Sequence, residues 1–474
     1  MTWLAVLTVA LVAQDQTPLL AAAEERAPRQ ATLWPGDWLE VRGARRDYLQ
    51  VYDHRHERPG YVHRRLVRAY EATEAAAPRL RAVIEFLREQ AGGEALGIGY
   101  VALYLKVAPR SALDAEVFSA LGTFAQRLAY RASAERTKRG QDSLGAHLDV
   151  ARSYGVRLAS FESDGRTRTC YDGEAFRRVL AFKAPPELKA RAALAVTDPA
   201  CVHPELGPRE RRTVLEWSAA LLDKVDPLAL PAYLGNRLRL RSARVAAELA
   251  FELARAGDRA AGAKRAEAAL ASLLRVDRRE LAEADLFAYE ETRVQVGTSR
   301  YLRGARASRP GRGLALRLEP RGPGETCVRL YARGRTNAKA AAPLVERCTH
   351  GLVHAASARV APRGERLVLA VQPLAGWLEL WVFQRGEKGF QVDVVVPATT
   401  EPRLGYVELA GFSPDGGRLL LAREVVAGRR WERRFEVLEV ATLAVKEQGA
   451  MLRRVPTFRR WFSPEWRGQT LALR

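Results

Sequence analysis

The sequence predicts a multidomain α+β protein: a small β-barrel at the N-terminus, an α-helical domain in the middle and an antiparallel β domain at the C-terminus. Short alternating segments between Gly and Pro turns fill residues 15–70. Apolar residues recur at three- and four-residue steps across residues 75–305. A turn motif recurs across residues 309–474. A chain of 474 residues also exceeds what one hydrophobic core supports.

The first segment is an apolar run from Trp3 to Ala13, about as long as the core of a signal peptide and too short to span a bilayer. No Lys or Arg precedes it, so a buried strand is the alternative. We interpret residues 1–14 as a signal peptide cleaved near Ala13. No other apolar stretch has spanning length, so we expect no transmembrane segment in the mature chain.

Residues 15–70 read as a series of short strands. They begin at Thr17–Leu20 and continue with alternating segments at Leu39–Val41 and Tyr48–Tyr52, before a last pair around Gly60–Val62 and Leu66–Val67. Several strands of this length separated by turns are typical of a small barrel.

This region contains a Gly-Asp turn before a strand, an aromatic residue that opens the next strand and a Gly-Tyr-Val close to the end; the residues are Gly36, Asp37, Tyr48, Gly60, Tyr61 and Val62. The pattern resembles the bacterial SH3-like family, which usually has Trp at the position of Tyr61. The family's Leu-Asn-Val-Arg start is replaced by Leu19–Ala22. The resemblance implies an SH3-like barrel that binds a cell-wall peptide or an envelope protein.

Small barrels expose aromatic side chains at their loop edge, and aromatic side chains contribute large contact areas to binding. We therefore predict a ligand-binding surface in this region, formed by four residues: Trp34, Trp38, Tyr48 and Tyr61.

Helical periodicity begins near residue 75. Apolar stripes predict helices around Leu80–Leu87, Ala95–Val107 and Val117–Leu128, and further helices start near residues 174, 187 and 209. Between Asp142 and Asp172 the signal is mixed and favours irregular structure or a short hairpin.

Two more helices, Ala243–Ala256 and Ala260–Leu274, are separated by Gly257 and Asp258. The pair resembles a tetratricopeptide-type helical hairpin, which implies a concave peptide-binding surface. An ordinary helical bundle is the alternative, because no sustained repeat of that length is present.

The C-terminal repeat is a turn that contains proline and runs into an apolar strand, and its prolines are Pro310, Pro362, Pro414 and Pro464. The units resemble those of WD-type and Tol-system β-propellers. Three units and a terminal strand at Thr470–Leu473 are fewer than the four blades that a propeller needs, so a sandwich or an open arc is the alternative. In the second sequence repeat we predict strands at 366–371, 377–383, 391–396 and 406–409.

The chain has four cysteines. Proximity in the sequence suggests the pairs Cys170–Cys201 and Cys327–Cys348, the second between neighbouring strands, although four cysteines allow three pairings. An even number in an exported chain favours disulfides over buried free thiols.

The net charge of +21 raises nucleic acid as a partner. However, only nine of the 76 basic residues are Lys, the arginines form no single block, and no nucleic-acid motif accompanies them. We therefore expect no nucleic-acid partner. Attraction to anionic cell-envelope polymers fits the charge equally well.

The sequence contains no Gly-x-Ser-x-Gly elbow, phosphate-binding loop or His-Glu-x-x-His pair. A thiol nucleophile at Cys170 with His203 as base and Asp172 as orienting group is one alternative, and paired carboxylates at Glu85 and Glu89 are another. A disulfide and a solvated helix side explain these residues more simply. We expect no catalytic residues and no cofactor.

Two groups of histidines have spacings that suit a metal: His54 and His56 beside Glu57, and His350 with His354 near Cys348. We interpret all of them as solvated or packed histidines, and we expect no metal.

Together these patterns predict a non-enzymatic binding or scaffold protein of the bacterial cell envelope, periplasmic or secreted. One alternative is a cell-wall hydrolase with its active site in the helical domain. A second is a basic nucleic-acid-binding protein.

Overall fold

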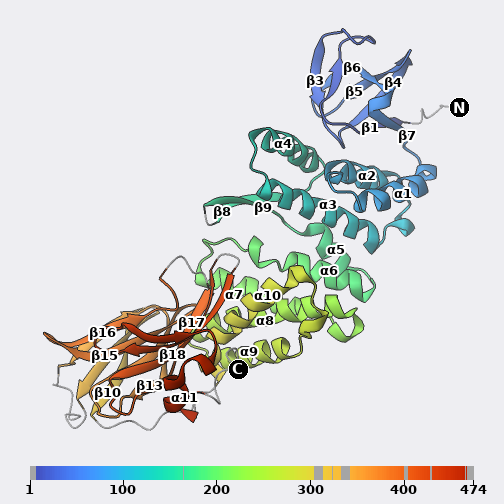
Figure 1. Ribbon diagram of the computed structural model, residues 1–474. Coiled ribbons are helices and arrows are strands. Elements are labelled where there is room, and N and C mark those ends of the chain that lie inside the picture. The colour runs from blue at the N-terminus through green and yellow to red at the C-terminus, as the bar shows by residue number, and fades with distance from the viewer. Residues whose placement is uncertain are drawn as a thin grey trace. The chain divides into compact units, whose positions relative to one another are not determined.

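The computed structural model describes residues 7–163, 165–303, 313–322, 324–332, 342–399, 404–427, 430–464 and 466 (Figure 1). It divides into two compact units, Met1–Leu206 and Gly207–Arg474. A seven-stranded antiparallel sheet, a helical middle and C-terminal sheets follow one another along the chain, which confirms the α+β class. The boundary between the units falls inside the predicted helical domain 75–305, so the first helices belong with the N-terminal sheet.

The N-terminal sheet has the strand order β3-β2-β6-β5-β4-β1-β7. Strands β4, β5 and β6 form an antiparallel meander, and a 3₁₀ turn at Arg64–Leu66 precedes β7. Alternate apolar residues such as Leu39 and Val51 point into one small core. The strands are β1 Thr8–Val12, β2 Thr17–Leu20, β3 Arg29–Leu33, β4 Trp38–Arg45, β5 Tyr48–Asp53, β6 Arg58–His63 and β7 Val67–Glu71.

The apolar run that was interpreted as a signal peptide contains strand β1 in the structure. Thr8–Val12 pairs with β4 on one side and β7 on the other, and Ala10, Leu11 and Val12 are fully buried. Cleavage near Ala13 would remove an internal strand of the sheet and leave two strand edges unpaired. An apolar run of this length suits a leader and a buried strand equally, and in the structure it is a buried strand.

Six helices and one hairpin follow in the described part of the first unit. The prediction for residues 142–172 was right about a hairpin, β8–β9, but α4 was not predicted, because only a few of its residues are apolar and buried. These elements are α1 Ala77–Arg88, α2 Glu94–Val107, α3 Ala115–Ala134, α4 Lys138–Ser153, β8 Leu158–Ser163, β9 Arg166–Tyr171, α5 Glu174–Ala181 and α6 Pro186–Val196.

The N-terminal sheet and these helices share a hydrophobic core, in which Val9, Leu11 and Tyr70 of the sheet pack with α1 to α4. The closest approach involves Gly36, whose φ of +93° favours glycine, and Gly99 of α2. A Cβ on Gly99 would lie 2.7 Å from the Gly36 carbonyl oxygen. The Tyr154 hydroxyl donates to the same oxygen at 2.5 Å. The Gly36-Asp37 turn therefore packs directly against the helices.

In the second unit, α8 and α9 form the predicted antiparallel hairpin. Gly257 adopts φ +99° between them, and the Asp258 carboxylate accepts a hydrogen bond from the Ala261 amide at 2.9 Å, which caps α9. The helices of this unit are α7 Pro208–Leu222, α8 Ala232–Arg255, α9 Arg259–Leu274 and α10 Glu283–Thr298. Helix α10 packs against β15, β17 and β18 of the C-terminal sheet.

The C-terminal part contains a three-stranded sheet, β10-β11-β12, and a larger sheet ordered β13-β14-β15-β17-β18-β19-β20, in which β16 also pairs with β15. A short helix, α11, follows at Pro456–Trp461. The strands are β10 Leu314–Gly322, β11 Glu325–Ala332, β12 Val345–Thr349, β13 Leu352–Val360, β14 Leu367–Leu374, β15 Trp377–Gly386, β16 Gly389–Val395, β17 Leu404–Phe412, β18 Arg418–Ala427, β19 Arg430–Glu439 and β20 Val445–Gly449.

The turns at Pro362 and Pro414 each join two strands of a hairpin, β13–β14 and β17–β18. The four strands predicted for the second sequence repeat are β14 to β17. Two repeats share one sheet, because β15 and β17 pair in parallel, and they do not form separate blades. Pro310 and the strand predicted at Thr470–Leu473 lie outside the described residues.

Among the residues that the structure describes, the helices include none that combines the length and the apolar character needed to cross a bilayer.

Candidate functional site

The four aromatic residues predicted to form one binding surface lie as two separate pairs. Tyr48 is 9% exposed and packs with Tyr61 in a small cluster under the β2–β3 connection; the other members of the cluster are Leu20, Ala22, Ala23 and Ala27. Trp34 and Trp38 flank the Gly-Asp turn instead and contact the helices.

Trp34 makes an edge-on contact with the His147 ring of α4, with 5.8 Å between the ring centroids. His147 is buried, and its Nε2 lies 2.8 Å from the Asp15 carboxylate. Trp38 lies under the Lys106 ammonium of α2, which is 4.0 Å from the ring centroid. Trp34 therefore has a structural contact, whereas Trp38 lies beside a cation.

Trp38 belongs to a row of rings on the outer side of β4 and β5. Because side chains alternate along a strand, Trp38 and Glu40 share one face of β4, and Glu40 pairs in register with Tyr52 of β5. The His54 ring then lies 4.9 Å from the Tyr52 ring and 6.4 Å from the Trp38 ring. We call Trp38, His54 and Tyr52 the aromatic row.

Charged side chains hold the aromatic row in place. The Arg42 guanidinium lies 4.1 Å from the Tyr52 ring centroid. The Glu40 carboxylate accepts a hydrogen bond from Arg42 Nε at 3.0 Å and lies 2.7 Å from His54 Nε2. These two hydrogen bonds, that from Arg42 first, lower the pKa of Glu40. Glu40 therefore stays ionised and links both partners.

The aromatic row is accessible to a ligand. The side chains of His54 and Arg42 are about half exposed, and Trp38 and Tyr52 are partly exposed. Ring faces of this kind stack on proline or on the apolar face of a sugar, and the cations beside them attract carboxylates. The aromatic rings and the cations beside them can contact a ligand, whereas the Glu40 carboxylate is already bound by Arg42 and His54.

The surface predicted from the sequence included Trp38 but not Tyr52 or Arg42. The available signal was alternation, which places Tyr52 on the opposite face from the buried Leu49 and Val51. Alternation along one strand does not show which residues of the neighbouring strand lie beside Tyr52.

Three of the four histidines in the groups predicted to be packed or solvated have a side-chain partner, and the fourth, His350, is exposed. His54 contacts Glu40, and His56 Nδ1 lies 2.5 Å from the Asp53 carboxylate. His354 is buried, with its Nε2 3.3 Å from Gln372 Oε1. Within the described ranges, the group with metal-ligand spacing is Cys327, Glu346 and Cys348, and its two cysteines are joined in a disulfide.

Both predicted disulfides are present, Cys170–Cys201 and Cys327–Cys348. The second joins residues that face each other across β11 and β12. The bond excludes Cys170 as a thiol nucleophile in the oxidised chain, and His203 contacts the Phe161 ring instead. Glu85, the other alternative, is exposed and pairs with Arg81 at 3.2 Å.

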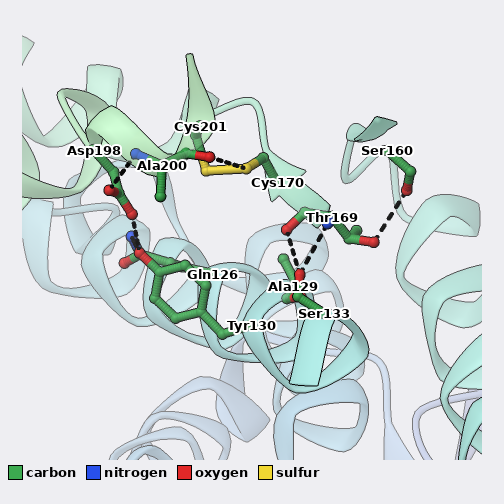
Figure 2. The surroundings of a disulfide bond; sticks show 10 residues. All are labelled: Gln126, Ala129, Tyr130, Ser133, Ser160, Thr169, Cys170, Asp198, Ala200 and Cys201. Carbon is green, nitrogen blue, oxygen red and sulfur yellow. Dashed lines mark hydrogen bonds between the residues drawn. A yellow bond between two sulfur atoms is a disulfide. The ribbon is translucent and has the colours of Figure 1, made fainter. Parts of the chain in front are cut away.

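Hydrogen bonds between α3 and the segments on both sides of the first disulfide surround that bond (Figure 2). The Thr169 amide donates to the Ser133 hydroxyl of α3 at 2.9 Å, next to Cys170. Near Cys201, the Asp198 carboxylate accepts hydrogen bonds from the Ala200 amide at 3.0 Å and from the Tyr130 hydroxyl at 2.5 Å. The disulfide thus ties the β8–β9 hairpin to the turn after α6, and both contact α3.

Comparison of the chain with protein-family models, with curated proteins and with solved structures found no match.

Proposed function

We propose that this chain is an exported, non-enzymatic binding or scaffold protein of the bacterial cell envelope, and that its N-terminal domain is an SH3-like module. The observation that carries the proposal is the aromatic row, Trp38, His54 and Tyr52, flanked by Arg42 and Lys106. The meander β4–β5–β6, with β2 beside β6, β1 beside β4 and a 3₁₀ turn before β7, supports an SH3-like arrangement.

The ligand that suits this surface is a cell-wall peptide or a segment of an envelope protein. SH3-type grooves use aromatic side chains to bind extended peptides. The Arg42 and Lys106 cations add attraction for carboxylates, and the net charge of +21 attracts anionic polymers at longer range. The C-terminal β repeats provide a second surface for a protein partner.

Export is supported by the two disulfides, because such bonds persist in oxidising compartments and are rare in the cytosol. Mass spectrometry of the chain from its native host tests this part. Two disulfides in a protein recovered from the periplasm or the medium are expected, whereas four free thiols in a cytosolic protein would exclude export.

Retention on purified sacculi tests the binding role. We expect the wild-type chain to be retained and both Trp38→Ala and Tyr52→Ala to lose about tenfold in affinity, because aromatic anchors dominate binding energies. Phe86→Ala is the matched control, since Phe86 is 66% exposed and belongs to α1, outside the strands that carry the aromatic row.

Analysis of the muropeptides after incubation separates binding from hydrolysis. Unchanged muropeptides with retention support a binding protein. New cleavage products would overturn the non-enzymatic role, and retention that is equal in all variants would overturn the role of the aromatic row.

A further inference from the structure

The second unit contains an open pocket of about 780 Å³ between the start of α7 and the end of α8. Gly324, next to the start of β11, also lines it. Most of the polar residues that line it are charged: Arg209, Glu210 and Arg212 from α7, and Glu252 and Arg255 from α8.

Glu252 is the unusual member of this pocket. It is 6% exposed, and its carboxylate makes no hydrogen bond or ion pair with any residue in the described part of the chain. Burial raises its pKa, although Arg255 and Arg211 act in the opposite direction. Its carboxylate oxygens are not among the fully buried polar atoms, so they face the open pocket. The hydrogen-bond donors of this carboxylate therefore come from what fills the pocket, either water or a ligand.

The pocket also offers positive groups that are not engaged. Neither Arg209 nor Arg255 forms a side-chain hydrogen bond or ion pair with a described residue, whereas Arg212 lies 3.7 Å from Glu216. Helix α7 begins at the pocket, and its N-cap residue is Gly207, whose amide donates to the Glu210 carboxylate at 3.0 Å, so one carboxylate already lies at this helix start. Anions bind favourably at such helix starts.

These groups together select the chemistry of the ligand. A simple anion would engage the arginines and the start of α7, but it would lie close to the Glu252 carboxylate and leave that group without a donor. A simple cation would engage Glu252 but face the arginines. A ligand that carries a carboxylate and, next to it, an ammonium or amide N–H engages both halves of the pocket.

We propose that this pocket binds an amino-acid-like group, with its carboxylate at Arg209, Arg255 and the first turn of α7 and its N–H donor at Glu252. The proposal is independent of the aromatic row, which belongs to the other unit. Failure of one therefore leaves the other in place.

Isothermal titration calorimetry of the full chain tests the proposal with three probes: alanine, inorganic phosphate and ethylamine. We expect alanine to bind at least about tenfold more tightly than either of the others, because only alanine meets both halves. Glu252→Gln should weaken alanine binding about tenfold without weakening phosphate binding, and Arg255→Gln should weaken both. Glu248→Gln, one turn earlier on α8, is the matched control, since Glu248 already pairs with Arg244.

Thermal unfolding of the same variants separates a binding role from a structural one. Glu252→Gln removes a buried carboxyl group that has no partner, so its melting temperature without ligand should equal or exceed that of the wild type. No alanine binding by the wild-type chain, equal binding by Glu252→Gln, or a clear loss of stability in that variant would each overturn the proposal.

Discussion

Protonation of His354 should destabilise the second unit in mild acid. This residue of β13 is 3% exposed and lies near the guanidinium groups of Arg259 and Arg300. Burial, with Arg259 as the next cause, lowers its pKa from 6.5 to about 3. The folded chain therefore keeps the imidazole neutral at a pH where the unfolded chain protonates it.

The sign and size of the effect follow from that difference. Since the unfolded state binds more protons between pH 6.5 and pH 3, the free energy of unfolding falls as the pH falls through this window and is unaffected by this group above it. The linkage relation gives a loss of about 3 kcal/mol between pH 7 and pH 4, out of about 5 kcal/mol for the full shift.

Urea denaturation at a series of pH values, followed by tryptophan fluorescence, measures this loss as a difference between variants. Because carboxyl groups titrate in the same range, the comparison is between wild type and His354→Gln, whose side chain does not titrate. His350→Gln is the control, since His350 is exposed. We expect the variant to lose about 3 kcal/mol less than the wild type on acidification. If the free energy of unfolding fell equally with pH in wild type and His354→Gln, the assigned role of His354 would be refuted.

Three further predictions concern stability, each measured by urea denaturation. Replacing Cys170 and Cys201 with alanine should cost about 3.7 kcal/mol, from the chain-entropy estimate for a separation of 31 residues; a loss below about 1 kcal/mol would contradict that estimate. Gly99→Ala should cost about 1–3 kcal/mol, because the new Cβ would lie 2.7 Å from a backbone oxygen, whereas Gly145→Ala in α4 meets no atom within 4 Å and should stabilise. Equal effects of the two glycine substitutions would show that the contact is not tight. Glu424→Ala should cost about 3–5 kcal/mol, since Glu424 is fully buried, accepts from Tyr406 at 2.9 Å and pairs with Arg293 at 3.2 Å. Glu432→Ala removes an exposed pair with Arg434 and should cost at most about 1 kcal/mol, and a similar cost for both glutamates would argue against the buried network.

Much of the fold was predictable because its signals are local. The apolar pattern of Ala95–Val107 predicted a helix there, and the Gly-Asp break at residues 257–258 predicted the turn between α8 and α9. Proximity in the sequence also selected the right cysteine pairs. The neighbours of Trp38 were not predictable in this way, because Tyr52 and His54 of the aromatic row lie on or beyond a different strand, β5.

The sequence by itself determined most of the helices and the position of several turns, because backbone preferences and apolar periodicity act over a few neighbouring residues, and it suggested the disulfide pairs through their proximity. Only the tertiary structure decided what depends on distant partners. It made Thr8–Val12 an internal strand by pairing it with β4 and β7, and it brought Tyr52 beside Trp38. It also buried Glu252, because packing of α8 in the fold sets the exposure of a helical side chain, and a carboxylate on a helix is otherwise expected in solvent.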